Sequence, residues 1–556
     1  MKAPLASFTP DIEIFDTTLR DGAQAEGISF SLRDKLAITA LLDDMGISFI
    51  EAGNPGSNPK DIEFFREARR LKLQYAKLCA FGSTRKKNTA AASDAALTHL
   101  LDAGTETVVI FGKSSRLHVK TVLKASLEEN LAMIYETVSF LRGEGRAVIY
   151  DAEHFFDGWQ DSPAYALKTL RTAAAAGAER LVLCDTNGGS FPETIAAGVR
   201  AVVDFFAAEN TGGAVPSDRG PVIGIHAHND MGLAIACSLS ALSAGAAHVQ
   251  GTLTGAGERC GNTCLAALIP SLEIKLRRRC LPVGKLARIS EFSRRAAEIS
   301  NITLSGGIPY IGTSAFAHKA GMHADAILKT SVSFEHIDPS LVGNGRHFLI
   351  SEMGGRSAIA ERVRPVCPGI TKDDPLIAEL VHRLKALEAD GWQFEGADAS
   401  FEILARKISG RHSSFFTILS YRVASEYHGQ EAAVPAGHIH SGVEAAANAW
   451  VKVLVGDECE IAAAEGDGPV NALDGALRRA LQRFFPELAR VRLSDYKVRV
   501  IDGNDATAAK VRVLIESTDG NSAWTTVGVS TDVIDASRKA LVDGIEYKLF
   551  SRPSAK

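Results

Sequence analysis

Residues 12–24 read IEIFDTTLRDGAQ, and the rest of the chain is organised around this stretch. Its alternating apolar residues predict a buried strand, which ends abruptly in Asp16, Arg20 and Asp21. Charged side chains are costly to bury unless they pair or bind a metal. The stretch therefore indicates a functional strand end, and a plain strand end with a local Asp–Arg pair is the alternative.

The same pattern, an apolar run followed by an amphipathic helix, recurs eight times up to about residue 276. The predicted strands start near residues 12, 48, 77, 106, 147, 180, 222 and 248. The predicted helices are 31–45, 58–71, 92–103, 124–142, 162–175, 191–208, 232–244 and 264–276. Ser31 ahead of Asp34 and Pro163 after Ser162 are typical helix starts. Glycines follow several of these helices, namely Gly46, Gly104, Gly177 and Gly245.

Eight such units are typical of a (β/α)8 TIM barrel, so the predicted fold class is α/β. A doubly wound open sheet is the alternative, although it usually has fewer strands and a glycine-rich first turn. In a barrel, functional groups collect at the C-terminal ends of the strands. Polar side chains follow that rule here, at Arg20/Asp21, Glu51/Gly53, Asp151/Glu153/His154, Asp185/Thr186/Asn187, His226/His228/Asn229/Asp230 and 257–262. The N-terminal ends of the strands are expected to carry little polar chemistry.

Beyond the barrel the β/α rhythm stops. We expect a barrel domain over 1–281, helical subdomains with a lid over 282–412, and an α+β domain over 413–556. The helical region contains predicted helices at 285–300 and 373–387, a Gly/Ser/Pro-rich lid segment at 305–327, and a polar linker at 406–413. The last domain uses a β-then-α unit twice, with strands at 449–455 and 511–516 and helices at 470–481 and 533–541.

Composition excludes several classes of protein. The formal net charge is −5, with 46% hydrophobic and 23% charged residues, so neither nucleic acid nor membrane is expected as a partner. No apolar signal region follows the first residues, and no apolar run is long enough to span a bilayer. The eight cysteines are scattered, which favours the reducing cytoplasm. Cys260 and Cys264 are expected to be buried thiols.

His226 and His228 lie two residues apart on a predicted strand, so their side chains share one face. Barrel closure places the first strand beside the last, which brings Asp21 towards these imidazoles. Two histidines and a carboxylate suit Mn, Zn, Fe or Mg, and such a metal is a Lewis acid for a carbonyl group. Hydrogen-bonded core histidines are the alternative.

Three further strand-end residues have both a functional and a structural interpretation. Arg20 can hold a carboxylate or stabilise an oxyanion, or it can pair with Asp16 or Glu51. Glu153 can transfer protons, or it can form hydrogen bonds that line the barrel. Thr186 can bind a substrate carboxylate, or its hydroxyl can be satisfied by the backbone.

Two segments outside these strand ends also carry candidate groups. The glycine-rich segment 255–262 lies where barrels often bind phosphate, which is weak support for such a site. His318 and His323 of the lid segment are candidate general bases.

Several motifs together resemble one family, the acyl-transferring DRE-type TIM-barrel metalloenzymes, which are the isopropylmalate, homocitrate and citramalate synthases. The motifs are DTTLRDG at 16–22, HAHND at 226–230 and GERCGN at 257–262, and 465–474 resembles the regulatory dimer domain of that family. Within the family, the segments at 53–61, 152–158 and 316–323 are similar to the longer bacterial citramalate synthases.

The resemblance implies a divalent metal (Mg, Mn or Zn) held by Asp21, His226 and His228, with Asn262 as a fourth ligand or close to it. It implies pyruvate and acetyl-CoA as substrates and (R)-citramalate and CoA as products, in the isoleucine pathway. It also implies a homodimer whose C-terminal domains bind an amino-acid effector, expected to be isoleucine.

The resemblance also implies roles for five further residues. Arg20 would stabilise the enolate or the carbonyl of the 2-oxo acid, which Glu153 and Thr186 would contact. His323 would take part in proton transfer, and Glu258 would orient the groups around it.

Three other functions stay open: the same reaction on a larger 2-oxo acid, as in the isopropylmalate and homocitrate synthases; a hydroxymethylglutaryl-CoA lyase; and a non-catalytic amino-acid sensor. The lyases lack a long C-terminal region. Three residues depart from the family pattern, since Ala320 stands where glycine is expected, and Met231 and Cys260 stand where smaller or more polar residues are expected.

Overall fold

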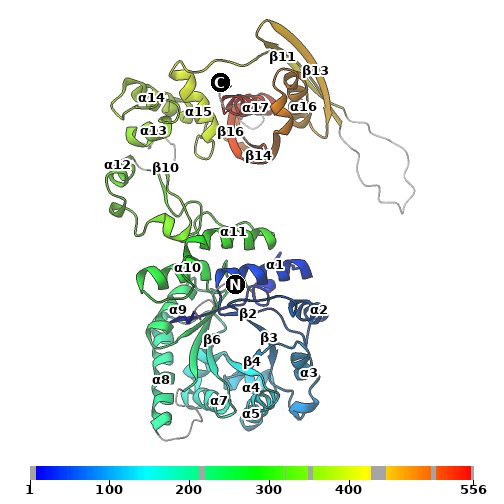
Figure 1. The fold of residues 1–556 in the computed structure, drawn as a ribbon, viewed down its shortest axis with the longest axis vertical. Helices are drawn as coiled ribbons and strands as arrows, with labels where there is room; N and C mark the ends of the chain where they lie inside the picture. The colour runs from blue at the N-terminus through cyan, green and yellow to red at the C-terminus, as the bar shows by residue number, and fades with distance from the viewer. Residues whose placement is uncertain are drawn as a thin grey trace, which may run out of the picture. The chain divides into compact units, whose positions relative to one another are not determined.

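The computed structural model describes residues 8–211, 220–319, 321–348, 355–426, 446–501 and 509–551 (Figure 1). The chain forms two compact units. The first comprises Met1–Phe316 and Ile337–Gly345, and the second comprises Ala317–His336 and Arg346–Lys556.

The first unit contains a closed barrel of eight parallel strands in the order β1 to β8, which confirms the predicted fold class. The strands are β1 (Glu13–Asp16), β2 (Phe49–Glu51), β3 (Lys77–Ser83), β4 (Thr107–Lys113), β5 (Ala147–Glu153), β6 (Arg180–Asp185), β7 (Val222–Ala227) and β8 (His248–Gly251). Each starts within a residue or so of its predicted position. β1 pairs with both β2 and β8, so the ring closes without a free edge.

Helices connect the strands around the barrel. They are α1 (Leu32–Met45), α2 (Pro59–Ala68), α3 (Ala95–Asp102), α4 (Arg116–Thr121), α5 (Leu127–Gly143), α6 (Phe155–Asp161), α7 (Pro163–Ala175), α8 (Pro192–Thr211), α9 (Ala234–Ser243) and α10 (Leu265–Pro270). The sequence pattern missed α4 and α6, because two turns are too short to show a helical period. The predicted helix at 264–276 continues beyond α10 only as a π-helical turn, Ser271–Lys275.

Local sequence signals set the helix ends. The main-chain N–H of Asp34 donates to Ser31 Oγ at 3.2 Å, and that of Ser31 donates to Asp34 Oδ2 at 2.9 Å, so α1 begins with a capping box. Gly46 ends the same helix with φ = 93°, a left-handed conformation that glycine adopts without a steric cost.

The N-terminal ends of the strands carry an ionic network, and the expectation of little polar chemistry there is wrong. Arg180 donates two hydrogen bonds to Glu13, at 2.7 and 2.6 Å, and His248 Nδ1 lies 3.2 Å from the same carboxylate. Burial alone would raise the pKa of Glu13, but Arg180 and His248 outweigh it and hold this pKa at about 2. The network joins β1, β6 and β8.

The barrel is followed by short helices that complete the first unit. These are η4 (Leu286–Arg288), α11 (Ile289–Ile299) and η6 (Pro339–Val342). The second unit begins with β9 (Ala317–His318), which pairs with β10 (His347–Phe348), and continues with α12 (Gly321–Lys329), η5 (Ser331–Ser333), α13 (Arg356–Val363), α14 (Pro375–Ala389) and α15 (Asp398–Ile408). The first three residues of the predicted linker at 406–413 belong to α15 instead.

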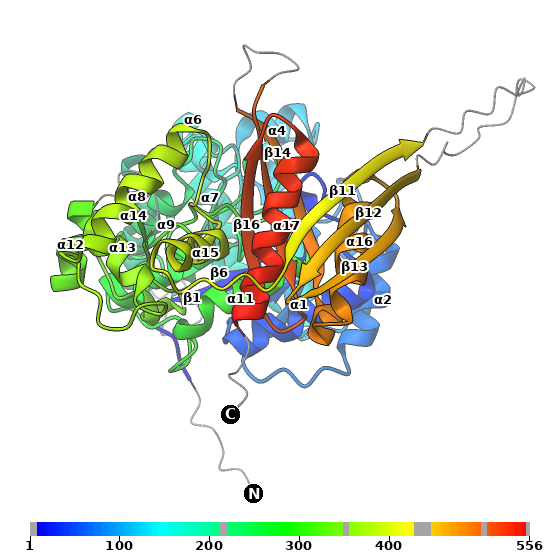
Figure 2. The ribbon, with the colours of Figure 1, turned by 90° about the horizontal axis from the view of Figure 1, so that it is seen from above.

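The C-terminal part of the second unit repeats one design, as the sequence pattern predicts. β11 (Thr417–Glu426), β12 (Ala446–Val455) and β13 (Glu458–Gly466) form an antiparallel sheet followed by α16 (Pro469–Gln482). β14 (Arg492–Val500), β15 (Val511–Thr518) and β16 (Ala523–Ser530) form a second sheet followed by α17 (Val533–Phe550). α16 packs on β12 and β13, and α17 packs on β15 and β16 (Figure 2).

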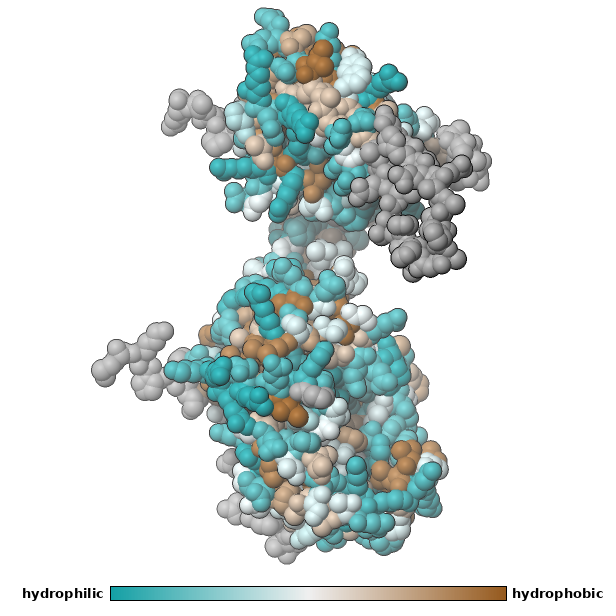
Figure 3. Space-filling model, turned by 90° about the vertical axis from the view of Figure 1, so that its right-hand side faces the viewer, coloured by the Kyte–Doolittle hydropathy of each residue, from teal (hydrophilic) through white to brown (hydrophobic). Residues whose placement is uncertain are grey.

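None of the helices in the described residues is long and apolar enough to cross a membrane. The face drawn in Figure 3 carries mostly hydrophilic side chains, with small separate groups of hydrophobic ones.

We predict that Arg180→Ala lowers the free energy of unfolding of the barrel by about 3 kcal/mol, because it leaves the partly buried carboxylate of Glu13 without its main partner. Arg171→Ala is the matched control: Arg171 pairs with Glu209 at 2.9 Å but is 59% exposed, so its loss should cost at most about 1 kcal/mol. Urea denaturation of both variants measures the difference, and equal losses would contradict a structural role for the network.

Candidate metal centre and active site

A cavity of about 230 Å³ lies at the C-terminal ends of the barrel strands. Seven of the nine predicted site residues line it: Arg20, Asp21, Glu153, Thr186, His226, His228 and Glu258. They come from the ends of β1, β5, β6 and β7 and from the loop after β8. The remaining lining residues are Gln24, Phe81, Phe111, Asp151, Cys184 and Arg259.

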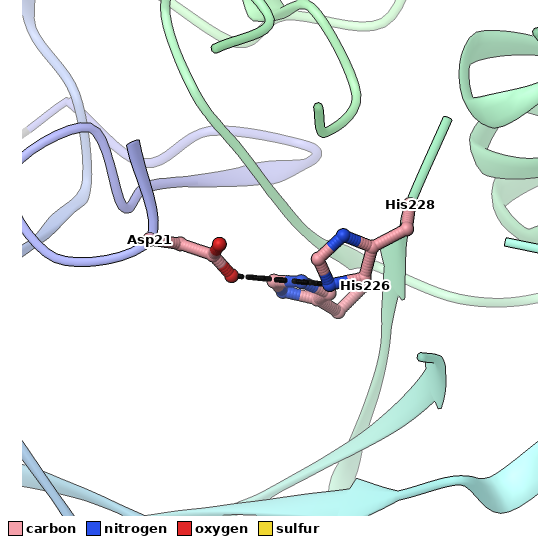
Figure 4. A group of neighbouring side chains, drawn as sticks. All are labelled: Asp21, His226 and His228. Atoms are coloured by element: carbon pink, nitrogen blue, oxygen red, sulfur yellow. Dashed lines mark hydrogen bonds and ion pairs between the residues drawn. The ribbon is translucent and has the colours of Figure 1, made fainter. Parts of the chain in front are cut away.

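Asp21, His226 and His228 point towards one another in this cavity (Figure 4). Asp21 Oδ2 lies 3.5 Å from His226 Nε2 and 3.9 Å from His228 Nε2, and the two Nε2 atoms are 3.3 Å apart. All three side chains are buried, and their potential ligand atoms lie within 4.8 Å of one another. The cluster has the size and the donor types of a metal site with open positions.

The electrostatics of the cluster favour the ligand forms of Asp21 and His228. Burial alone would raise the pKa of Asp21, but Arg20 and His226 outweigh it, so the pKa is lowered and the group is ionised. Burial and the neighbouring His226 lower the pKa of His228 to about 4, which keeps this imidazole neutral near pH 7. Burial opposes a charge on His226, but the contact with Asp21 outweighs it and raises the pKa.

Unpartnered polar atoms support the fit to a metal ion. Asp21 Oδ1 and Asn262 Oδ1 are buried without a hydrogen-bond partner. A backbone bridge pairs His228 with Asn262, which places the main chain of Asn262 beside the cluster, although Asn262 is not among the residues that line the cavity. Buried polar groups normally have partners, and each exception needs an explanation. One carboxylate, two imidazoles and an amide oxygen are a donor set that a divalent cation can use.

A residue outside the predicted set orients His226. Gln250 Nε2 donates to Asp151 Oδ1 at 3.0 Å, so its Oε1 faces His226 Nδ1 at 2.8 Å. His226 Nδ1 therefore carries the proton and Nε2 presents its lone pair to the cavity. The alternative interpretation, a hydrogen-bonded core histidine, therefore applies to Nδ1 of His226 only, because Nε2 faces the cavity. In the sequence, the signal that could have identified Gln250 is a polar residue inside the buried run HVQG at 248–251.

Arg20 is held in place by contacts on several sides. Its Nε donates to Glu51 Oε2 at 2.6 Å, NH1 lies 3.3 Å from Asp21 Oδ2, and the guanidinium lies 3.9 Å from the centre of the Phe81 ring. Burial would lower the pKa of Arg20, but Glu51 and Asp21 outweigh it and raise it. The ion pair with Glu51 is thus real, and it fixes a cation that still faces the cavity.

Glu153 and Thr186 make the structural contacts that their alternative interpretations predict. Glu153 pairs with Lys113, and Thr186 Oγ1 accepts a hydrogen bond from the main-chain N–H of His154 at 2.8 Å. Both side chains nevertheless line the cavity. The hydroxyl hydrogen of Thr186 remains able to donate to a bound molecule.

The loop after β8 brings Glu258 and Arg259 to the cavity. Arg259 donates to Asp230 at 2.8 and 2.9 Å and to the carbonyl of Thr186 at 2.8 Å. Cys260 is exposed, which corrects the expectation of a buried thiol, because the turn between Glu258 and Gly261 faces solvent.

The other predicted site residue, His323, belongs to α12 in the second unit, where it is exposed and its ring stacks on Phe334 at 4.0 Å. Its role in proton transfer stays a prediction. His318 contacts Glu335 at 3.0 Å in the same unit. Ala320 lies outside the described residues, and Met231 is exposed.

The comparisons with known proteins agree with this architecture. The HMGL-like family model matches residues 11–292. The (R)-citramalate synthase of Synechocystis is 47% identical, with 98% of this chain and 97% of that protein covered, and the one from Geobacter sulfurreducens is 44% identical, with 97% of each covered. The chain belongs to the (R)-citramalate synthase family. The probable 2-isopropylmalate synthase of Methanopyrus kandleri is 31% identical, with 96% of this chain and 98% of that protein covered.

Two more family models match residues that follow the barrel in the sequence. Residues 310–391 match the homocitrate synthase post-HMGL domain-like family, and residues 395–549 match the LeuA allosteric (dimerisation) domain. The chain therefore carries a domain of regulatory type after its barrel in the sequence.

We predict that Asp21→Ala weakens binding of Mn²⁺ or Zn²⁺ by more than about 100-fold, because a carboxylate ligand is lost. Asp230→Ala is the matched control, since Asp230 also lies at the barrel mouth but pairs with Arg259 outside the cluster. In the unchanged protein, binding should weaken as the pH falls, because protons compete for His226, whose pKa is raised. Metal titration by calorimetry checks both points, and equal affinities of the two variants would contradict the assignment.

Proposed function

We propose that this chain condenses acetyl-CoA with pyruvate and hydrolyses the thioester, giving (R)-citramalate and CoA. The observation that carries the proposal is its similarity, over nearly the full length of both chains, to (R)-citramalate synthases at 43–47% identity. The cavity supports it, because a buried arginine, a candidate metal centre and a hydroxyl donor converge on a space of small-molecule size.

A divalent cation, for which Mg, Mn and Zn are the candidates, would be held by Asp21, His226, His228 and the amide oxygen of Asn262, and would supply a Lewis acid for the carbonyl of the 2-oxo acid. Arg20 would stabilise the negative charge that develops on the enolate or on the carbonyl oxygen. Its ion pair with Glu51 fixes the guanidinium in advance, which is what transition-state stabilisation requires.

The remaining proposed roles concern binding and protons. Thr186 would donate its hydroxyl hydrogen to the carboxylate of pyruvate, and Glu153 would contact the same substrate. A base removes a proton from the acetyl methyl group, the resulting enolate carbon attacks C2 of pyruvate, and the new alkoxide takes up a proton. Water then hydrolyses the thioester of this product, which releases (R)-citramalate and the CoA thiol. We propose that His323 takes part in these proton transfers and that Glu258 orients the groups around it.

Two aromatic rings form part of the cavity wall. Phe81 and Phe111 line the cavity and stack on each other, with ring centres 5.2 Å apart and planes inclined by 15°. We propose that these rings restrict the space for the longer side chain of 2-oxoisovalerate or 2-oxoglutarate. This arrangement supports pyruvate as the 2-oxo acid.

The three-part division at residues 281/282 and 412/413 remains part of this proposal. The C-terminal domain would bind isoleucine as the effector, between the two copies of a homodimer, and the match to an allosteric dimerisation domain supports this role. Isoleucine should then lower the activity where leucine does not, in the same assay as below. The eight cysteines are all free, which supports a reducing cytoplasm as the location.

Metal-dependent release of the CoA thiol from acetyl-CoA tests the function, with pyruvate, 2-oxoisovalerate and 2-oxoglutarate compared side by side. We expect clear preference for pyruvate. Preference for a larger acid would keep the chemistry and overturn the substrate. Thiol release with none of the three, with metal present, would overturn the proposal in favour of a lyase or a sensor.

We predict that Phe111→Ala raises the activity with 2-oxoisovalerate relative to pyruvate by about 10-fold or more, because it removes most of one ring from the cavity wall. Phe140→Ala is a control, since Phe140 packs against the core away from the lining of the cavity. The ratio of kcat/KM values for the two acids is the measurement, and an unchanged ratio in Phe111→Ala would contradict the role of the ring pair.

A further inference from the structure

The turn at the end of β5 has an unusual backbone. His154 has φ = 57° and ψ = 36°, the left-handed conformation that residues with a side chain rarely adopt. It follows Glu153 directly and precedes the first residue of α6, yet its side chain does not cap that helix. Such conformations persist only where the surroundings hold them, and they often occur at functional sites.

Three contacts hold the side chain of His154. Its ring stacks on His118 of α4, with ring centres 3.7 Å apart and planes inclined by 14°. Its Nδ1 lies 2.9 Å from Asp157 Oδ2, and Asn187 Nδ2 donates to the same oxygen at 2.9 Å. The turn after β5 is thereby tied to α4 and to the loop after β6.

The left-handed turn directs the main-chain N–H of His154 towards Thr186 in the cavity wall. The main-chain N–H of His154 donates to Thr186 Oγ1 at 2.8 Å. Because the hydroxyl oxygen accepts this bond, its hydrogen is directed elsewhere and can be donated into the cavity that Thr186 lines. Asn187, the next residue, is held by Asp157, and Arg259 donates to the carbonyl of Thr186 at 2.8 Å. Thr186 is thus fixed from both sides.

We propose that His154 is a positioning residue for the 2-oxo acid: its left-handed turn, locked by His118, Asp157 and Asn187, orients the Thr186 hydroxyl as a donor to the substrate carboxylate. This inference rests on the proposed function, in which Thr186 binds that carboxylate. A group that holds the carboxylate equally before and during the reaction affects KM and leaves kcat nearly unchanged.

A double-mutant cycle on the full-length enzyme tests the inference, with KM for pyruvate as the readout. We expect Thr186→Val to raise this KM about 10-fold, as the loss of a hydrogen bond to a charged group does. His154→Val should raise it several-fold, because a branched side chain disfavours the left-handed turn, whereas His154→Asn, which tolerates that turn but loses the ring contacts, should raise it less. The KM for acetyl-CoA should not move in any of them.

The double variant, Thr186→Val with His154→Val, shows whether the two residues act together. If His154 acts through the hydroxyl of Thr186, His154→Val adds no further increase in the KM for pyruvate in the Thr186→Val background. Should His154→Val fail to fold, Asp157→Ala replaces it: this variant loosens the anchor and should raise the KM for pyruvate only while Thr186 is present.

Independent, multiplying effects would overturn the inference and leave the proposed function intact. Equal damage from His154→Asn and His154→Val would also overturn it, because ring packing would then be the cause. An unchanged KM for pyruvate in Thr186→Val would overturn the role of Thr186 itself, and absence of any turnover of pyruvate in the unchanged enzyme would overturn the proposed function.

Discussion

The pairing of β1 with β8 is the constraint on which the site depends. The two strands align Glu13 with His248, Phe15 with Gln250 and Asp16 with Gly251. β8 also pairs with β7, where His226 stands opposite Gln250. Side chains alternate between the two faces of a strand, so a slip of one residue would turn Gln250 away from His226. Closure of the barrel through β1 and β8 therefore brings Asp21 beside the two histidines, and the register of β7 on β8 selects the ring nitrogen that His226 presents.

The same register organises the opposite end of the barrel. Glu13 and His248 are partners in the β1–β8 pairing, and Arg180 from β6 completes their network. Between the two polar ends lies an apolar layer formed by Phe15, Phe49, Cys79, Val109, Ile149, Val182 and Cys184. A layer of this kind separates the charges that hold the barrel together from the charges of the cavity, so each group can be altered with limited effect on the other.

The sequence predicted the parts that depend on local pattern. Apolar runs marked the start of every barrel strand, and the spacing His226-Ala-His228 at a strand end placed two imidazoles on one face. It missed what depends on neighbours remote in the chain. Gln250 and Lys113 carry no motif, and only the folded register shows that they contact His226 and Glu153. The two interpretations of Arg20 were treated as alternatives, although its pair with Glu51 is what holds it at the cavity.

The balance of buried charge gives a physical reason for a cation in this cavity. Arg20 is close to both Asp21 and Glu51, so its single positive charge is shared between two carboxylates. Asp151 is buried beside them without a salt bridge in the described residues, and burial together with the charge of Glu51 raises its pKa to about 7. A further negative charge is therefore costly in this corner, and Asn262 Oδ1 and Asp21 Oδ1 add unsatisfied acceptors. A divalent cation at Asp21, His226 and His228 would compensate both, so these buried acceptors are what would give the pocket affinity for a metal.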